Sequence, residues 1–177
     1  MKKLPLLMSV LLGLSSSAFA DWTLLNDESS LHYVSIKSTN IAEMNRFKTL
    51  TGSVSEQGAV ELKVDLSSVD TGVDIRDERM QTMLFDVAQF AQATVTGKVD
   101  LERVTKLEVG ETYTDSITLN LALHGLSKEV SSHVQVTRLA DDKVLITTLE
   151  PVVLNAADYK LAEGLEALRV IAKLPAI

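Results

Sequence analysis

The stretch "VELKVDL", residues 60–66, decides how this chain folds. Apolar side chains occupy every second position from Val60 to Leu66, and charged side chains occupy the positions between them. Because successive side chains of a β-strand point to opposite faces, this alternation predicts a strand with one buried face. The stretch "ITLNLALH", residues 117–124, repeats the pattern, with its apolar side made of Ile117, Leu119, Leu121 and Leu123.

Alternation of this kind continues along most of the chain. Weaker versions predict further strands at residues 32–38, 47–55, 94–104, 130–139 and 143–154. Short polar breaks follow several strands, at 55–59, 124–129 and 139–143, and two of the three contain glycine. Strands joined by tight turns form an antiparallel meander, so we predict an all-β domain whose strands form a barrel or a sandwich.

Two stretches have helical periodicity instead. The apolar residues of the first are spaced as on one face of a helix: Met80, Met83, Leu84 and Val87. Asp74, followed three residues later by Asp77, predicts an N-cap with its reciprocal partner just before this face. A second short helix is expected over residues 161–174, where Gly164 weakens the pattern.

The first twenty residues have the pattern of a secretory signal peptide. A basic "MKK" precedes the apolar "LPLLMSVLLGL", and Ala18-Phe19-Ala20 fits an A-x-A cleavage site. We therefore expect residues 1–20 to be removed and residues 21–177 to form one domain. No later segment approaches the roughly 20 apolar residues of a membrane helix, so stable membrane insertion is not expected. The expected compartment is the periplasm, with secretion as the alternative.

Composition excludes several classes of partner and site. Removal of Lys2 and Lys3 reduces the 17 basic residues to 15, against 24 acidic ones. This negative balance disfavours binding to nucleic acid and to anionic lipid surfaces. The chain has no cysteine, which excludes a cysteine nucleophile, a CxxCH haem attachment and a zinc ribbon.

The sequence offers little evidence of catalysis. Its densest acidic stretch does not match a calcium-binding loop, and Arg76 and Arg79 lie within it, so we expect these acids to be ionised and to cap a helix. The histidines His32, His124 and His133 lack metal-ligand spacing. No G-x-S-x-G motif occurs, although distant residues can still assemble a triad. We expect no metal, no cofactor and no enzymatic activity.

The apolar surface has two interpretations. The apolar strand faces and the apolar helix face can pack together as one ordinary core. Alternatively, they can line an eight-stranded barrel that encloses one small ligand. Composition and periodicity leave both open.

Three collinear stretches resemble the YceI family, which comprises exported lipid-binding proteins with a lipocalin-like barrel. The first is "LSSVDTGVDIRDERMQTMLFDVAQFAQATVTGKV", residues 66–99, which contains the family's S-[IV]-[DN]-T, R-D-x-x-[LM] and F-[DF]-V-x-x-[FY] elements. The second is "LNLALHGLSKEVSSHVQV", residues 119–136, and the third is "VVLNAADYKLAEGLEALRVIAKLP", residues 152–175. Together they cover essentially all of the mature chain.

The resemblance implies a fold and a function. The implied fold is a single antiparallel lipocalin-like β-barrel of about eight strands with one or two short helices. Because the family usually continues with one more apolar strand past the position of Ile177, the resemblance also implies a barrel that lacks its last strand. The implied function is a non-catalytic carrier that encloses a long apolar molecule, such as a polyisoprenoid, an isoprenoid quinone or a fatty acid or amide.

By analogy with the family, the segment 76–90 covers or borders the cavity. The candidate ligand-binding residues are Met80, Met83, Leu84, Phe85, Phe90, Phe47 and Tyr159. The chain departs from the family where Ala91 replaces a proline and Arg79 a histidine. Two other functions stay open: a hydrolase or isomerase with a lipid-like substrate that uses His32, His124 or an acid, and an interaction module with an unpaired edge strand. A homodimer is also possible.

Overall fold

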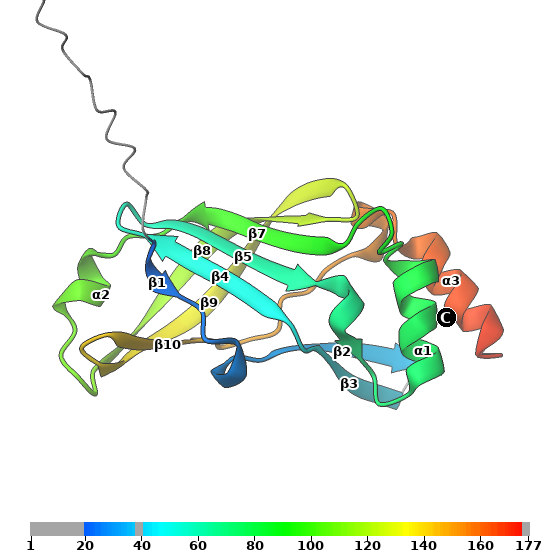
Figure 1. Cartoon of the computed structure of the whole chain (residues 1–177), viewed down its shortest axis with the longest axis horizontal. Helices are drawn as coiled ribbons and strands as arrows, with labels where there is room; N and C mark the ends of the chain where they lie inside the picture. The colour runs from blue at the N-terminus through cyan, green and yellow to red at the C-terminus, as the bar shows by residue number, and fades with distance from the viewer. Residues whose placement is uncertain (1–19, 38–40, 175–177) are drawn as a thin grey trace, which may run out of the picture.

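The structure, a computed structural model, describes residues 20–37 and 41–174 (Figure 1). The predicted signal peptide lies outside the described residues except for Ala20, and so does the end of the chain, 175–177. The strands in the described part are β1 (Ala20–Thr23), β2 (Leu31–Lys37), β3 (Ile41–Phe47), β4 (Leu50–Ser55), β5 (Ala59–Asp65), β6 (Val69–Asp70), β7 (Gln92–Lys98), β8 (Thr112–Leu123), β9 (Leu126–Ala140) and β10 (Lys143–Thr148). They form one sheet in the order β1-β4-β5-β7-β8-β9-β10 and a second in the order β2-β3-β6.

Three long strands bend in the middle, so that one half of each belongs to the larger sheet and the other half to the smaller sheet. β1 pairs with β4 and β2 pairs with β3, while β4 pairs with β5 and β3 pairs with β6, always antiparallel. Because β1 leads to β2, β3 to β4 and β5 to β6, each pairing continues past a bend into the second sheet. Two hydrogen bonds join these bends, from Leu50 N to Asn26 Oδ1 at 2.7 Å and from Lys48 N to Ser68 O at 3.1 Å.

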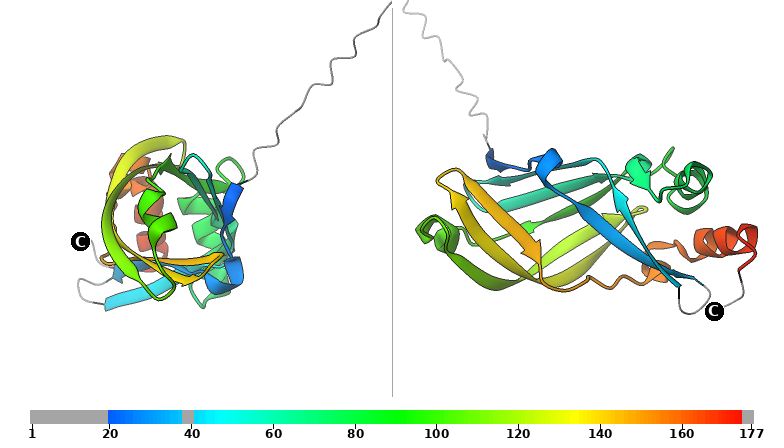
Figure 2. Two further views of the ribbon diagram at one scale, coloured as in Figure 1. Left: turned by 90° about the vertical axis from the view of Figure 1, so that its left-hand side faces the viewer. Right: turned by 90° about the horizontal axis from the view of Figure 1, so that it is seen from below.

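The result is a sheet curled into a half-barrel (Figure 2). Counted with their bends, the strands number seven in the described part, which confirms the all-β antiparallel fold predicted from the sequence. Among the described residues, β1 and β10 are the outer strands of the larger sheet, and β2 and β6 those of the smaller one. The strand expected over 143–154 ends at Thr148, and one backbone bond then holds the chain against β9, from Leu149 N to His133 O at 2.9 Å.

Helices lie at both ends of the half-barrel (Figure 1). At one end, α1 (Asp74–Arg79) continues into a turn of π-helix, Met80–Leu84, and α3 (Ala162–Ile171) packs against this turn. We call this the α1 end. At the opposite end lies α2 (Glu102–Lys106), which the sequence analysis did not predict. The expected strand 94–104 was therefore wrong in its second half.

α3 packs unusually closely at Gly164. A Cβ at this position would lie 2.4 Å from the Met83 carbonyl oxygen and 2.9 Å from Leu84 Cα. Both contacts are with backbone, which does not move aside as the tip of a side chain would. Gly164 weakened the helical pattern in the sequence, and the structure shows why a helix nevertheless contains glycine here.

Gly164→Ala tests this contact. Glycine to alanine stabilises an ordinary helix interior by about 1 kcal/mol. Here we expect the free energy of unfolding to fall by about 1–3 kcal/mol in urea titrations, because the added methyl group forces α3 away from the π-helical turn. A variant more stable than the wild type would contradict the close packing.

Candidate functional site

The inner face of the curled sheet carries a row of apolar residues that are only half-buried. In the strand register Val54 pairs with Val60, Val60 with Gly97, and Leu119 with Val130. Gly97 and Leu119 are neighbours, since a Cβ on Gly97 would lie 2.3 Å from Leu119 Cδ2. These five residues cross five strands, and we call them the apolar belt. All five are of intermediate burial.

The belt lies between two packed clusters, and its Val130 packs against the one at the α1 end. On the inner face, the row of Leu50, Val64, Ala93 and Leu123 at the α1 end is fully buried. Towards the α2 end, Val104, Val134 and Val136 are also buried, in a separate cluster. Apolar residues in the middle of a filled core would be buried to the same degree. The belt is therefore apolar surface that the protein's own side chains leave partly open, as a site for an apolar ligand requires.

Four of the seven predicted site residues lie in the cluster at the α1 end. Met80, Leu84 and Phe85 come from the π-helical turn and the residue after it, and Tyr159, 2 % exposed, comes from the 3₁₀ turn before α3. Phe47 of β3 packs against them, with its ring centroid 5.8 Å from that of Phe85. The structure thus brings these five predicted residues together, and contact with a ligand stays a prediction.

The other two predicted residues lie outside the buried cluster. Phe90 is half-buried and packs on His124 of the β8–β9 turn, with ring centroids 4.4 Å apart. Met83 is 36 % exposed, although its backbone carbonyl faces Gly164 of α3. Of the π-helical turn, Met80 and Leu84 are the two buried residues.

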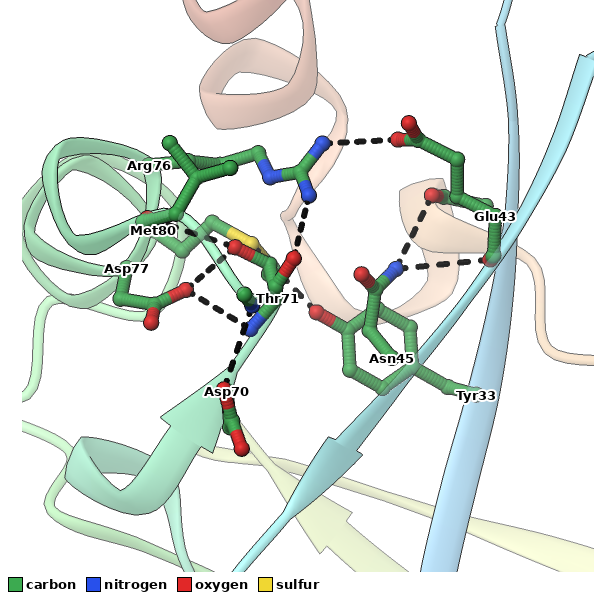
Figure 3. A network of polar contacts seen from close by, with 11 residues as sticks. Tyr33, Glu43, Asn45, Asp70, Thr71, Arg76, Asp77 and Met80 are labelled. Carbon is green, nitrogen blue, oxygen red and sulfur yellow. Dashed lines mark hydrogen bonds and ion pairs between the residues drawn. The ribbon is translucent and has the colours of Figure 1, made fainter.

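A polar network attaches α1 to the β2–β3 hairpin (Figure 3). Arg76 forms an ion pair with Glu43 of β3, with Nη1 and Oε2 2.7 Å apart, and its Nη2 donates to the Thr71 carbonyl at 2.6 Å. Asp77 Oδ1 accepts from the backbone N–H of Thr71 at 2.9 Å and from its hydroxyl at 2.5 Å. Arg76 therefore holds α1 against the hairpin, and Asp77 fixes the start of the helix on Thr71.

The structure corrects the expected N-cap. Asp74 is the first residue of α1, and Val73 occupies the N-cap position without a side-chain hydrogen bond. Asp77 does reach back across the helix start, as expected, but its partner is Thr71. The sequence spacing identified the acid that bonds and misassigned the residue to which it bonds.

Tyr33 connects this network to the apolar cluster. Its ring packs on Phe47 with centroids 5.4 Å apart, and its hydroxyl donates to the sulfur of Met80 at 3.4 Å. Burial, and secondarily the charge of Asp77, raises the pKa of the Tyr33 hydroxyl above its ordinary value. Beside it, Asn45 is buried at 5 % exposure and donates from Nδ2 to Ser35 Oγ at 3.2 Å. The inner face of the hairpin is therefore polar next to the aromatic rings.

The histidines occupy three separate places. His124 sits at the β8–β9 turn with a φ of 50°, and its Nδ1 lies 3.2 Å from the Tyr159 carbonyl oxygen. His133 pairs with Glu150 at 2.5 Å and lines an open hollow of about 260 Å³. His32 lines another hollow, of about 350 Å³, beside the Arg46–Asp70 ion pair. Hydrogen bonding to Arg46 lowers the pKa of Asp70.

Residues 20–37 and 41–174 contain no group of three or more acids or histidines placed to hold a metal ion. Within these ranges, no helix is both long and apolar enough to cross a membrane.

Sequence reasoning missed the polar partners of the site and most of the belt. Leu119 and Val60 were assigned to apolar strand faces, but no pattern indicated that this part of the face is less buried than the rest. Tyr33 lies in a strand that was predicted, but nothing in its spacing marked it; Asn45 was not singled out because β3 was not predicted at all, since Glu43 and Asn45 make its inner face polar. A buried polar side chain leaves no periodic signal in the sequence.

Comparison with known proteins gives a consistent family assignment. A family model described as YceI-like domain matches residues 22–174. A solved structure of a polyisoprenoid binding domain from Saccharophagus degradans, implicated in plant cell wall breakdown, is 37% identical, with a TM-score of 0.81 over 89% of this chain and 87% of that one. BcnA of Burkholderia cenocepacia is 19% identical, with a TM-score of 0.60 over 77% and 83% of the two chains, a likeness of fold alone. No curated protein matches the sequence.

The network around α1 gives a first prediction for this site. Asp77→Ala removes the acceptor of two hydrogen bonds from Thr71, so we expect the free energy of unfolding to fall by about 1–2 kcal/mol. Asp74→Ala, at an exposed position of the same helix, should change it by about 0.5 kcal/mol or less. Urea titration of both variants measures the difference, and equal effects would contradict the role assigned to Asp77.

Tyr33 gives a prediction about alkaline pH. Its pKa is higher in the folded than in the unfolded protein, so its contribution to stability is complete below about pH 10 and falls as the pH rises above that value. Tyr33→Phe removes the ionisable group. We expect the wild type to lose stability more steeply than this variant above about pH 10, as followed by urea unfolding at increasing pH. Parallel pH profiles would show that Tyr33 is not buried as described.

Proposed function

This chain belongs to the YceI-like domain family, and from that premise we propose that it binds a long apolar molecule along the apolar belt. The observation that supports the proposal is the half-burial of Val54, Val60, Leu119 and Val130 on the inner face between two packed clusters. The polyisoprenoid named for the 37% identical relative fits this chemistry, because an isoprenoid chain presents only hydrocarbon. Isoprenoid quinones and fatty chains belong to the same class of ligand.

Burial supplies the binding energy in this proposal. Each methylene group transferred from water to the belt contributes on the order of 0.8 kcal/mol, so a long chain binds without many polar contacts. The belt crosses five strands, so a chain can run along the inner face rather than enter a small round pocket. The two hollows of about 260 and 350 Å³ have polar linings, including Asp115 in one and Asp70 in the other, and suit such a chain less well.

A polar head group would lie at the α1 end. The Tyr33 hydroxyl, the Asn45 amide and the Arg76 guanidinium lie there beside the apolar cluster. The candidate residues Met80, Leu84, Phe85, Phe47 and Tyr159 pack in the cluster beside these polar groups, and their contact with a ligand stays a prediction. At the α2 end the inner face becomes charged, where Arg103 lies 3.5 Å from Asp115 and packs over the Tyr113 ring.

The finer proposal is an exported, non-catalytic carrier. The "MKK", apolar run and Ala18-Phe19-Ala20 pattern support export to the periplasm. A carrier binds and releases its ligand without making or breaking covalent bonds, and the belt with the helices beside it is sufficient for this. Secretion into the medium is the alternative fate of the exported chain.

Extraction of the bound molecule tests the proposal. We expect native mass spectrometry of protein purified from its own host to show an added mass, which organic solvent removes and which fragments as an isoprenoid or fatty chain. Val60→Phe places a larger side chain in the belt and should reduce the bound fraction at least tenfold, about 1.4 kcal/mol. Val153→Phe, at a 92 % exposed position, is the matched control and should retain the ligand.

Two outcomes would contradict the belt as the site. One is wild-type protein that carries no lipid and takes up none from solution. The other is Val60→Phe protein that retains as much lipid as Val153→Phe. Circular dichroism and urea unfolding of both variants establish that each is folded.

A further inference from the structure

The β2–β3 hairpin has its apolar side turned outward. Val34 pairs with Met44 across the two strands and Ile36 pairs with Ala42, so these four side chains share one face. Val34, Ile36 and Met44 are 60, 61 and 71 % exposed. A single exposed apolar residue on a protein surface is ordinary, but neighbouring ones that form a patch indicate an interaction site.

The inner face of the hairpin explains this orientation. Tyr33, Asn45 and Glu43 point inward, where they contact Met80, Ser35 and Arg76. The pairing of Arg46 with Asp70 and of Phe47 with Val69 fixes the register of β3. Because a shift by one residue would exchange the two faces, these contacts hold Val34, Ile36 and Met44 on the outside.

The patch does not continue to the start of α1. Met44 lines the hollow of about 350 Å³ together with Thr71 and Gly72. The next residue in the chain, Val73, is 46 % exposed. A polar hollow that also contains Arg46 and Asp70 therefore separates the exposed apolar face of the hairpin from Val73 at the start of α1.

A second copy of the chain does not fit this patch well. Edge-to-edge pairing of two β2 strands would satisfy backbone groups but leave the outer apolar faces in water. Face-to-face packing would bury three exposed side chains of the hairpin, on the order of 300 Å², against about 800 Å² per partner in a standard protein interface.

Charge distinguishes the hairpin from the rest of the chain. Residues 31–48 contain three basic residues, Lys37, Arg46 and Lys48, and one acidic residue, Glu43. The remainder of the mature chain is strongly acidic, and its overall charge disfavours approach to a phosphate-rich surface. The hairpin is thus a segment that can approach lipid phosphates without repulsion, with apolar side chains foremost.

We propose that the outer face of the β2–β3 hairpin, through Val34, Ile36 and Met44, docks reversibly on the surface of a phospholipid bilayer. The inference rests on the proposed function, because a molecule with a long apolar chain is held in membranes and must enter or leave the carrier there. The hairpin also forms one wall of the α1 end, so docking brings that end to the lipid. The contact is peripheral and involves no spanning segment.

Vesicle flotation of delipidated full-length mature protein tests the docking surface. The probe is a vesicle of phosphatidylcholine and phosphatidylethanolamine. We expect wild-type protein to float with the vesicles and the triple variant V34S/I36S/M44S to bind at least tenfold more weakly. The matched control is V109S/I146S/V153S, which replaces three residues that are 58, 59 and 92 % exposed elsewhere, and it should float like the wild type.

Each other outcome overturns the docking proposal. Such outcomes are wild-type protein that does not float, and a hairpin variant that floats like the control. Another is a wild-type dimer in light scattering that the hairpin substitutions dissociate while flotation is unchanged, which would assign the face to a second copy. The single variant Val34→Ser, with an intermediate loss expected, replaces the triple variant if the latter does not fold.

Native mass spectrometry of protein from the same preparation, before lipid removal, separates the two proposals. Protein that carries a lipid from its host but does not float contradicts the docking proposal and is consistent with the proposed function. Protein that floats but never carries a lipid contradicts the proposed function.

Discussion

The structure depends on one constraint: the inner face of a long, bent antiparallel sheet is apolar over a greater length than the protein's own side chains fill. The alternation in β5 and in β8 from Ile117 to Leu123 places apolar residues on this face over most of its length. Helices at both ends help close it, with α1, its π-helical turn and α3 at one end and α2 at the other. Between them the belt stays half-buried, and the proposed ligand binding follows from that surface.

The charged residues at the start of α1 have a structural function that serves the site. Arg76 pairs with Glu43 and so holds the helix on the hairpin, while Asp77 accepts hydrogen bonds from Thr71 and so fixes the start of the helix. The same contacts make the inner face of the hairpin polar and turn its apolar side outward. The same polar network therefore fixes the position of α1 and the orientation of the β2–β3 hairpin, whose apolar face points outward.

The sequence predicts the fold well where a pattern is periodic and poorly where tertiary contacts decide. The strands over 60–66 and 117–124 and the helix over 161–174 were located because their apolar spacing repeats. β3 was missed because Glu43 and Asn45 occupy its inner positions, where the pattern requires apolar residues. α2 was missed because it is short and begins at a local bond from Glu102 N to Asp100 Oδ1. The candidate site shows the same division. Helical spacing placed Met80 and Leu84 on one apolar face and the family resemblance added Phe85, whereas the degree of burial along the belt depends on which strands bend and where.

Photo-crosslinking tests the central claim most directly. An isoprenoid chain that carries a diazirine along its length is bound to the mature protein, irradiated and mapped by peptide mass spectrometry. The account predicts adducts on β4, β5, β8 and β9 at or next to Val54, Val60, Leu119 and Val130, and fewer in Val60→Phe protein. Two results would contradict it. One is a set of adducts confined to the outer face of the hairpin. The other is an adduct yield on the belt no higher than in Val153→Phe protein denatured in urea.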